Sequence, residues 1–285
     1  MTDYTRPGPM TSAGAHAGLL TRLPHDVAGL AAVGHGLLIH EHIAPSYDVE
    51  LSDDDRATVH LRRVEDLLGR IAERDGRPLT EPREPGDRVP GNCRHFTVLL
   101  VTALRAFDVP ARARCGFGDY FGTGTFEDHW VAEHWNGDRW VLVDGQIDAV
   151  QRGLFPIDFD VTDVPRDRFL VAGEAWRRCR AGEADPALFG LAFAGESGLW
   201  WIAGNLMRDA AALLNVELLP WDCWGAMPGP EEEIGRETAA LFDRLAGLTL
   251  DPDANADELR ELCQDERLGV PAVVRNAVRE RDEPV

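Results

Sequence analysis

A histidine and an aspartate in the middle of the chain are spaced so that a β-hairpin would bring them together. The pair Asn136-Gly137 stands between two runs in which apolar and polar residues alternate. Asn-Gly favours a two-residue type I′ turn, because both central residues of that turn take positive φ. With these two residues as the loop, His129 lies directly opposite Asp144. Opposed side chains share one face, with Cβ atoms about 5 Å apart, so the spacing predicts an imidazole–carboxylate pair.

Such a pair is the basic half of a nucleophilic triad, and Cys93 is the nucleophile that the sequence offers. The carboxylate would hold the imidazole in one tautomer, and the free ring nitrogen would take the thiol proton. Cys93 stands at the predicted start of a helix, where unpaired backbone N–H groups and the helix dipole favour a thiolate. Gly91 permits a tight approach of the backbone just before it. We therefore predict Cys93 as nucleophile, His129 as base and Asp144 as the group that orients the base.

A helix and a sheet are needed to position these residues, and the central sequence predicts both. An apolar stripe at helical spacing follows Cys93 and ends at Pro110. Its members are Phe96, Leu99, Leu100, Ala103, Leu104 and Phe107. Three short β-like runs follow, at 111–117, 129–135 and 139–144. The predicted fold class is α+β, with a Cys-bearing helix packed on an antiparallel sheet and extra helices at both ends.

The flanking segments are predicted to be mainly helical. Residues 1–16 are rich in Pro, Gly, Ser and Thr and are predicted to form a loose tail. The remaining parts are an N-terminal helical region at 17–88, the catalytic core at 89–165 and a C-terminal helical region at 166–285, unless all of them form one compact domain. Apolar periodicity predicts continuous helices over 54–74 and from 256 to the acidic end.

The charge of the chain restricts its partners. The 285 residues carry a formal net charge of −20, and the pI is about 4.8. A surface of this charge repels polyanions, so we expect neither nucleic acid nor a membrane as a partner. The longest apolar stretch, 27–39, is too short to span a bilayer. A neutral or cationic substrate fits this charge better, and the substrate class that we expect is a small molecule, a peptide or an acyl thioester.

Cysteine usage and the amino terminus indicate a reducing compartment. The five cysteines are an odd number, and none forms a CxxC pair, so we expect neither a disulfide framework nor a zinc site. The first residues lack a basic segment followed by an apolar one. We therefore expect a cytoplasmic protein without metal or organic cofactor. The sequence does not indicate an oligomeric state.

Five short motifs, in their order along the chain, resemble the transglutaminase-like superfamily. They are Gly-Asn-Cys-Arg at 91–94, Ala-Leu-Arg-Ala at 103–106, Val-Pro-Ala-Arg at 109–112, Asp-His-Trp at 128–130 and Trp-Val-Leu-Val-Asp at 140–144. The resemblance covers about residues 89–150. It implies a papain-like core in which the cysteine forms a thioester with an acyl donor, which an amine or water then resolves.

The sequence departs from the family at three points. Animal transglutaminases use a tryptophan upstream of the cysteine for the oxyanion, whereas the first tryptophan here is Trp130. The backbone N–H of Cys93 and the side chain of Asn92 are the donors expected instead. Asp108 stands where this helix often ends with glycine. No calcium loop is evident, so calcium dependence is not carried over.

Other residues near the predicted triad have both a functional and a structural interpretation. Glu133 and Trp135 share the face of the predicted base, where Glu133 would either orient a substrate amine or form a salt bridge. Tyr120 and Phe121 lie in a glycine-rich loop that is either a lid or clamp on the substrate or a plain connection. Asp128 either tunes the mouth of the site or is an ordinary loop charge.

We therefore expect a cysteine-dependent acyl-transfer enzyme that acts on an amide, ester or thioester carbonyl. Hydrolysis of an amide or peptide bond is the first interpretation, and amide-bond formation with an amine acceptor is the second. Both predict an acyl-enzyme on Cys93. The third interpretation is a non-catalytic binding module that keeps the fold. Such a module would form no acyl adduct, and Cys93→Ala would leave its binding unchanged.

Overall fold

The computed structural model describes residues 3–230 and 232–285, which form two compact units. Unit 2 consists of Asp3–Ala113 and Trp130–Val164, and unit 1 contains Arg114–His129 and Pro165–Val285. The strands β3 (Ala111–Gly118) and β4 (Phe126–Trp135) each contain residues of both units. The segment predicted as the catalytic core is therefore divided between the units.

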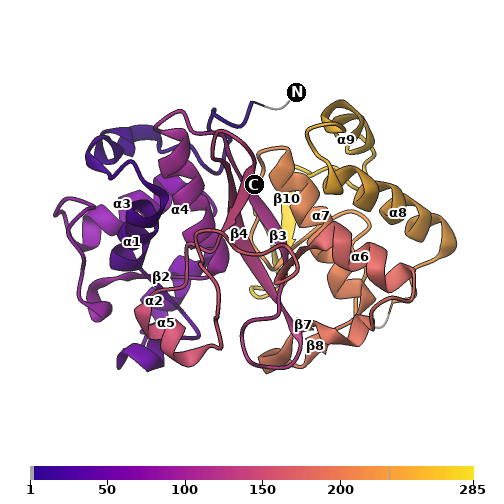
Figure 1. Ribbon diagram of the computed structural model, residues 1–285, viewed down its shortest axis with the longest axis horizontal. Helices are drawn as coiled ribbons and strands as arrows, with labels where there is room; N and C mark the ends of the chain where they lie inside the picture. Colours follow the sequence, from indigo (N-terminus) through magenta and orange to yellow (C-terminus); the bar gives the residue numbers. More distant parts are fainter. Residues whose placement is uncertain (1–2, 231) are drawn as a thin grey trace. The chain divides into compact units, whose positions relative to one another are not determined.

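Unit 2 is built around a group of helices. They are α1 (Val27–Leu37), α2 (Asp53–Ala57), α3 (Val64–Arg74), α4 (Cys93–Arg105) and α5 (Ala149–Leu154), with 3-10 helices η1 (Gly14–Arg22), η2 (Ala44–Tyr47), η3 (Thr58–His60) and η4 (Pro85–Asp87). The strands of this unit are β1 (Leu38–His40), β2 (Val89–Gly91) and β5 (Trp140–Val143). Helices α1 and α3 both pack on α4, as Figure 1 shows in purple.

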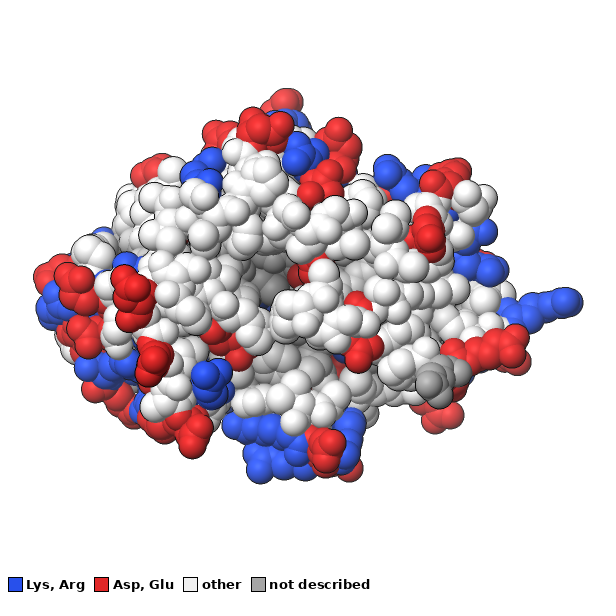
Figure 2. Space-filling model, turned by 90° about the horizontal axis from the view of Figure 1, so that it is seen from below, with Lys and Arg blue, Asp and Glu red and all other residues white. Residues whose placement is uncertain are grey.

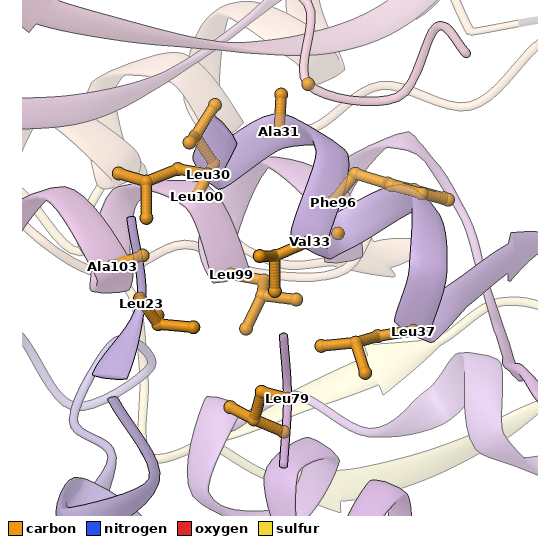
Figure 3. A pocket seen from close by; sticks show the side chains of 12 residues that line it. Leu23, Leu30, Ala31, Val33, Leu37, Leu79, Phe96, Leu99, Leu100 and Ala103 are labelled. Atoms are coloured by element: carbon orange, nitrogen blue, oxygen red, sulfur yellow. The ribbon is translucent and has the colours of Figure 1, made fainter. Parts of the chain in front are cut away.

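The helix that carries Cys93 is the centre of unit 2. Every residue of α4 is buried, so this helix has no solvent-facing side. Its predicted apolar stripe meets α1, and Figure 3 shows the facing side chains, among them Leu30 on α1 and Leu99 and Leu100 on α4. The cavity among them measures about 10 Å³, close to the minimum that one water needs. The interface between the two helices is therefore filled, and it fixes the axis of α4.

The N-terminal residues do not form the loose tail that their composition predicts. Residues 1–2 lie outside the described part of the chain, but Tyr4 and Met10 are buried in unit 2. The Tyr4 carbonyl accepts from the Ala111 N–H at 3.1 Å. The Arg105 guanidinium donates to the Thr11 hydroxyl at 2.7 Å. A few apolar side chains and backbone contacts distant in sequence are enough to order a segment rich in proline and glycine.

The predicted continuous helix over 54–74 is wrong, because the chain leaves helical geometry between η3 and α3. Leu61 takes an extended conformation at the end of η3. The carbonyls of Leu61 and Arg62 accept there from the Arg94 guanidinium, at 3.3 and 2.5 Å. The break therefore provides acceptors for a buried side chain that follows Cys93.

The main sheet is mixed rather than wholly antiparallel. Its strand order is β6-β3-β4-β7-β8, and β5 also pairs with β4. The pairs β4–β5 and β3–β6 are antiparallel, whereas β4 and β7 are parallel. The fold class is α+β, as predicted, and the parallel β7 is the departure from the predicted antiparallel sheet.

The hairpin between β4 and β5 forms as predicted, but its register differs. Trp135 pairs with Trp140, so the loop is 136–139 rather than two residues. The Asn136 side chain causes this, since its Oδ1 accepts from the N–H groups of Asp138 and Arg139, at 3.0 and 2.9 Å. Within the loop only Gly137 has positive φ, whereas a type I′ turn needs two such residues.

The predicted pairing of His129 directly opposite Asp144 is therefore wrong. Ala132 pairs with Val143, and one further step of this register sets Asp144 opposite Val131. The error is two residues, which is one full period of a strand. The assignment of side chains to the two faces of β4 and β5 is therefore unchanged.

Unit 1 combines helices with short strands. The helices are α6 (Ala172–Arg180), α7 (Leu199–Leu213), α8 (Arg236–Leu250) and α9 (Ala256–Leu262), with 3-10 helices η5 (Pro186–Leu188) and η6 (Ala192–Ala194). The strands are β6 (Phe169–Val171), β7 (Phe189–Leu191), β8 (Glu196–Ser197), β9 (Asp222–Cys223), β10 (Val273–Asn276) and β11 (Arg281–Pro284). Helices α6, α7 and α8 pack against one another (Figure 1). A buried ion pair joins Arg114 of β3 to Asp209 of α7, through two hydrogen bonds of 2.9 and 2.8 Å.

The predicted helix from 256 to the end of the chain is wrong beyond α9. Strands β9, β10 and β11 form a small antiparallel sheet. In β10, Val274 and Asn276 are buried and their neighbours are exposed, which is the two-residue period of a strand. Gly269 and Pro271 precede this segment and interrupt helical propagation.

The surface charge is mixed on the face that Figure 2 shows. Acidic and basic side chains lie mainly around its edge in mixed clusters, and the area between them is mostly uncharged with a few acidic groups. The acidic excess of the chain is therefore not gathered into one patch on this face. No helix in the described part of the chain combines the length and the apolar character needed to cross a bilayer.

Candidate active site

Cys93 is the first residue of α4, and Asn92 caps this helix. The Asn92 side-chain oxygen accepts from the Arg94 N–H at 3.1 Å, and His95 completes a capping box with the Asn92 N–H at 3.2 Å. Cys93 is 8 % exposed. Its backbone N–H belongs to the first turn of the helix, where no intrahelical acceptor exists. The side chain and the backbone N–H of Cys93 thus share the positive end of a buried helix.

The Asn92 amide has one unused donor. Its Oδ1 accepts from the Arg94 N–H at 3.1 Å and lies 2.9 Å from the His95 Nδ1. Asn92 is 5 % exposed. Its Nδ2 atom is buried and has no hydrogen-bond partner. Burying an amide N–H without an acceptor costs stability. A donor of this kind beside Cys93 is suited to an oxygen of a bound molecule.

Gly91 and His95 explain the tight backbone before the cysteine. A Cβ atom on Gly91 would lie 2.9 Å from the His95 Cβ, so glycine is required at this close approach. The His95 Nε2 faces the Leu61 carbonyl at 3.0 Å. Burial, with the neighbouring Arg94 charge, holds the pKa of His95 well below its ordinary value. His95 is therefore a neutral structural residue of the helix cap.

Asp144 directly follows β5 in unit 2 and is completely buried. Its backbone N–H donates to the Val161 carbonyl at 2.8 Å, and its Oδ1 accepts from the Gln146 N–H at 3.1 Å. A neighbouring histidine that the sequence analysis missed, His35 of α1, hydrogen-bonds the Gly145 backbone. Burial lowers the pKa of His35, and the charges of Asp148 and Asp144 oppose that effect. The turn after β5 is thus held on both sides.

His129 lies in unit 1 and is surrounded by aromatic rings. Phe121 and Tyr120 meet its imidazole edge-on, with ring centroids 4.9 and 6.1 Å away. Phe169 of β6 lies 6.4 Å away. Tyr120 is fully buried, whereas Phe121 is half-buried. The structure thus brings both predicted loop aromatics to the histidine.

The loop that carries these aromatics is anchored at its base. Asp119 accepts from the Arg168 guanidinium at 2.7 Å and donates its backbone N–H to the Arg168 carbonyl at 3.1 Å. The tip, 122–124, is exposed. The loop therefore packs two rings against His129 and leaves a short tip in solvent. Its role as a lid or clamp stays a prediction.

Asp128 hydrogen-bonds a tryptophan of α7, and its predicted role at the mouth of the site stays a prediction. Its carboxylate accepts from the Trp201 indole N–H at 2.7 Å. Burial raises the pKa of Asp128, and the nearby Arg208 and His129 charges oppose that effect. Asp128 therefore belongs to a polar cluster of α7 in unit 1, where Arg208 also donates to Asn205 at 3.0 Å.

Glu133 is buried in an ion pair. It is 1 % exposed, and its Oε2 accepts from the Arg112 guanidinium at 2.6 Å. The same guanidinium lies over the Trp140 ring, 3.8 Å from its centroid. Of the two interpretations of Glu133, the salt bridge is confirmed. Trp135 is 37 % exposed at the end of the hairpin and packs edge-on against Trp140.

Glu41 is a further carboxyl near the nucleophile that the sequence did not single out. It follows β1, and its backbone N–H donates to the Gly91 carbonyl at 2.9 Å, two residues before Cys93. Its side chain is 12 % exposed and lines an open hollow of about 630 Å³. Burial, opposed by Arg56, raises the pKa of Glu41 to about 7. The pairing of β1 with β2 brings Glu41 close to the residues before Cys93. No local motif in the sequence indicates that pairing.

The raised pKa of Glu41 predicts a pH-dependent stability. Its folded pKa of about 7 exceeds the ordinary 4.5, so the folded state binds the proton more tightly and stability falls as pH rises between these values. We expect Glu41→Gln to match wild type near pH 4.5 and to be more stable at pH 8, by up to about 3 kcal/mol. Urea unfolding at the two pH values measures this. Glu50→Gln, an exposed carboxyl of the same hollow, is the control. If Glu41→Gln changes the free energy of unfolding by the same amount at both pH values, the prediction is contradicted.

All five cysteines are free thiols. Burial raises the pKa of Cys179 and of Cys263 to about 11 in each case. In the described part of the chain, no three His, Cys, Asp or Glu side chains are grouped so as to hold a metal ion.

Comparisons with known proteins find a similarity for part of this chain. Residues 76–145 match the model of the transglutaminase-like superfamily. A crystal structure of a "putative cysteine protease" from Cytophaga hutchinsonii is similar at 17 % identity, with a TM-score of 0.33. The aligned region covers 59 % of this chain and 44 % of the other chain. No curated protein matched.

Proposed function

We propose that the chain is a thiol acyl-transfer enzyme with a Cys93–His129–Asp144 triad, on the premise that residues 76–145 match the transglutaminase-like superfamily. Its substrate is an amide, ester or thioester carbonyl compound. Hydrolysis is the first reaction proposed, because water needs no binding site of its own. Amide formation with an amine acceptor is the alternative, and it shares the same acyl-enzyme.

The proposed reaction proceeds in two halves. His129 takes the Cys93 proton, and the thiolate attacks the carbonyl carbon. The C–S bond forms as the bond to the leaving amine, alcohol or thiol breaks, and the proton on His129 passes to that leaving group. Water or an amine then gives its proton to His129 and attacks the thioester. The C–S bond breaks, and the proton returns to the Cys93 sulfur.

The observation that carries this proposal is the pair of donors at the start of α4. The backbone N–H of Cys93 is in the first helical turn, and the Asn92 Nδ2 is buried without a partner. A tetrahedral intermediate on Cys93 places an oxyanion next to its own N–H, where two preorganised donors stabilise it. A helix cap that needed only an acceptor would be served by Ser, Thr or Asp without an orphaned donor.

The test of the proposed function is direct detection of the acyl-enzyme. The protein is incubated with p-nitrophenyl acetate, and tryptic peptides are examined for an acetyl group on Cys93. Parallel reactions with and without methylamine then separate the two chemistries, since hydrolysis gives acetate and amide formation gives N-methylacetamide. A protein that acquires no acetyl group on Cys93 under these conditions is better described as a binding module that keeps the fold.

Asn92→Ser separates the role of the amide donor from the role of the cap. Serine still accepts from the first-turn N–H groups but has no Nδ2, so we expect the rate of acylation to fall by about 10²- to 10³-fold. The free energy of unfolding should change by less than about 1 kcal/mol. Asn92→Ala, which also removes the cap, should lose stability in addition. A wild-type rate in Asn92→Ser would show that the donor is not used.

A further inference from the structure

The orientation of the Asp144 carboxylate depends on the turn that follows it. Asp144 is buried, and its Oδ1 accepts from the backbone N–H of Gln146 at 3.1 Å. That N–H keeps its direction only if the backbone of Gln146 is held in place. The elements that hold Gln146 therefore act on the carboxylate without touching it.

The side chain of Gln146 is held by a chain of hydrogen bonds that leads to a distant segment. Its Nε2 donates to the Gln151 Oε1 at 2.9 Å, and both residues are almost completely buried. The Gln151 Nε2 donates to the Tyr47 hydroxyl at 3.1 Å and lies 3.3 Å from the Gln146 carbonyl. Tyr47 belongs to η2, more than a hundred positions earlier in the chain.

The chain of hydrogen bonds closes on itself through Asp148. The Asp148 carboxylate caps α5 by accepting from the N–H groups of Val150 and Gln151, both at 3.0 Å. The Tyr47 hydroxyl hydrogen-bonds Asp148 as well as Gln151, and burial raises the pKa of Tyr47 above its ordinary value. Tyr47 therefore keeps its proton and can donate to Asp148 while it accepts from Gln151. The turn that begins at Asp144 and α5 are locked together by these contacts.

This arrangement carries a cost that apolar packing would avoid. The Gln146 Oε1 is buried and has no partner, and an unmet acceptor in the interior destabilises the fold. A turn that needed only stability would be served by apolar side chains of similar volume. The polar arrangement instead fixes the direction of the Gln146 backbone N–H relative to the Asp144 carboxylate. In a Cys–His–Asp triad, that direction decides whether the imidazole is held in its useful tautomer.

We propose that Tyr47, Gln151 and Gln146 form a polar clasp whose role is to position the Asp144 carboxylate for catalysis. The inference rests on the proposed function, since it assigns positioning residues to the same triad. The three side chains do not contact the reacting atoms. They act on the rate of the chemical step, and the affinity for substrate should be unaffected.

Tyr47→Phe tests the clasp with the smallest possible change, because it removes only the hydroxyl. We expect the rate of Cys93 acetylation by p-nitrophenyl acetate at saturation to fall by between about 10- and 100-fold, with KM within about twofold of wild type. The rate of Cys93 alkylation by iodoacetamide near pH 6 should fall in parallel. Tyr4→Phe is the matched control, because Tyr4 is the other tyrosine of unit 2 and packs on Trp140. That control should keep wild-type rates.

Gln151→Leu provides a second variant that breaks the clasp at its centre. If the residues act through one chain of contacts, the double variant with Tyr47→Phe should be no slower than Gln151→Leu alone. Wild-type rates in both single variants, with only a lowered melting temperature, would overturn the proposal and leave a structural role. A wild-type protein that forms no acyl-enzyme would instead remove the proposed function, and the positioning role with it.

Discussion

Replacing Cys93 with serine is expected to abolish the acyl-enzyme and to slow ester cleavage by at least about 10⁴-fold. The hydroxyl is a much weaker nucleophile than a thiolate and gains little from an imidazole placed for sulfur. The change is small, and Cys93 is 8 % exposed in the first turn of α4, so the fold should be retained. Cleavage of p-nitrophenyl acetate, followed by release of p-nitrophenolate, measures the loss.

Cys263→Ser is the matched control for this substitution. Burial raises the pKa of the Cys263 thiol to about 11, so it stays protonated at neutral pH and should contribute nothing. Wild-type rates are expected for Cys263→Ser. Equal rates for Cys93→Ser and wild type would show that ester cleavage occurs elsewhere, and the acyl-transfer proposal would be abandoned.

The largest effect on stability is expected from Glu133→Ala. Glu133 and Arg112 are both almost fully buried and share a hydrogen bond of 2.6 Å. Removing the carboxylate leaves the guanidinium charge inside the protein, which costs about 3–5 kcal/mol. Urea unfolding gives the change in the free energy of unfolding directly. Acylation of the folded Glu133→Ala protein should be unaffected, since the Glu133 carboxylate is buried in its ion pair with Arg112.

The double variant Arg112→Met with Glu133→Leu separates the pair from its surroundings. Replacing both partners removes the stranded charge, so much of the lost stability should return. Some loss should remain, because the Arg112 side chain also packs over the Trp140 ring. A cost below about 1 kcal/mol for Glu133→Ala alone would mean that the pair is not buried in solution.

The position of Cys93 could be predicted from local sequence alone. The apolar stripe after it has a clear helical period, Pro110 ends the helix, and Gly91-Asn92 supplies a tight approach and a cap. All of these signals are short-range and agree with one another. The hairpin was also predictable, but its register depended on whether Asn136 used its backbone conformation or its side chain to make the turn. The structure shows the side chain accepting two N–H groups, which moves the pairing by two residues.

The features that could not be predicted all depend on contacts between distant segments. The sequence around Glu133 does not predict that its side chain is buried, because the burial depends on the ion pair with Arg112. Tyr47 and Gln151 are unremarkable polar residues in sequence, and only folding joins them. The tail around Met10 is ordered by side chains such as Arg105, about a hundred residues later. Composition and periodicity indicate only local structural preferences, so they do not predict contacts between residues that are distant in the sequence.

The most direct test of the central claim is alkylation of the five cysteines by iodoacetamide, resolved by mass spectrometry, from pH 5 to pH 9 in wild type and His129→Ala. A cysteine paired with an imidazole reacts well below the pH at which a free thiol ionises, about 8.5. The account predicts that Cys93 alone reacts fast near pH 6 and that His129→Ala abolishes this advantage. If Cys93 reacts no faster than the other four, or if its fast reaction survives in His129→Ala, the proposed Cys93–His129 partnership is contradicted.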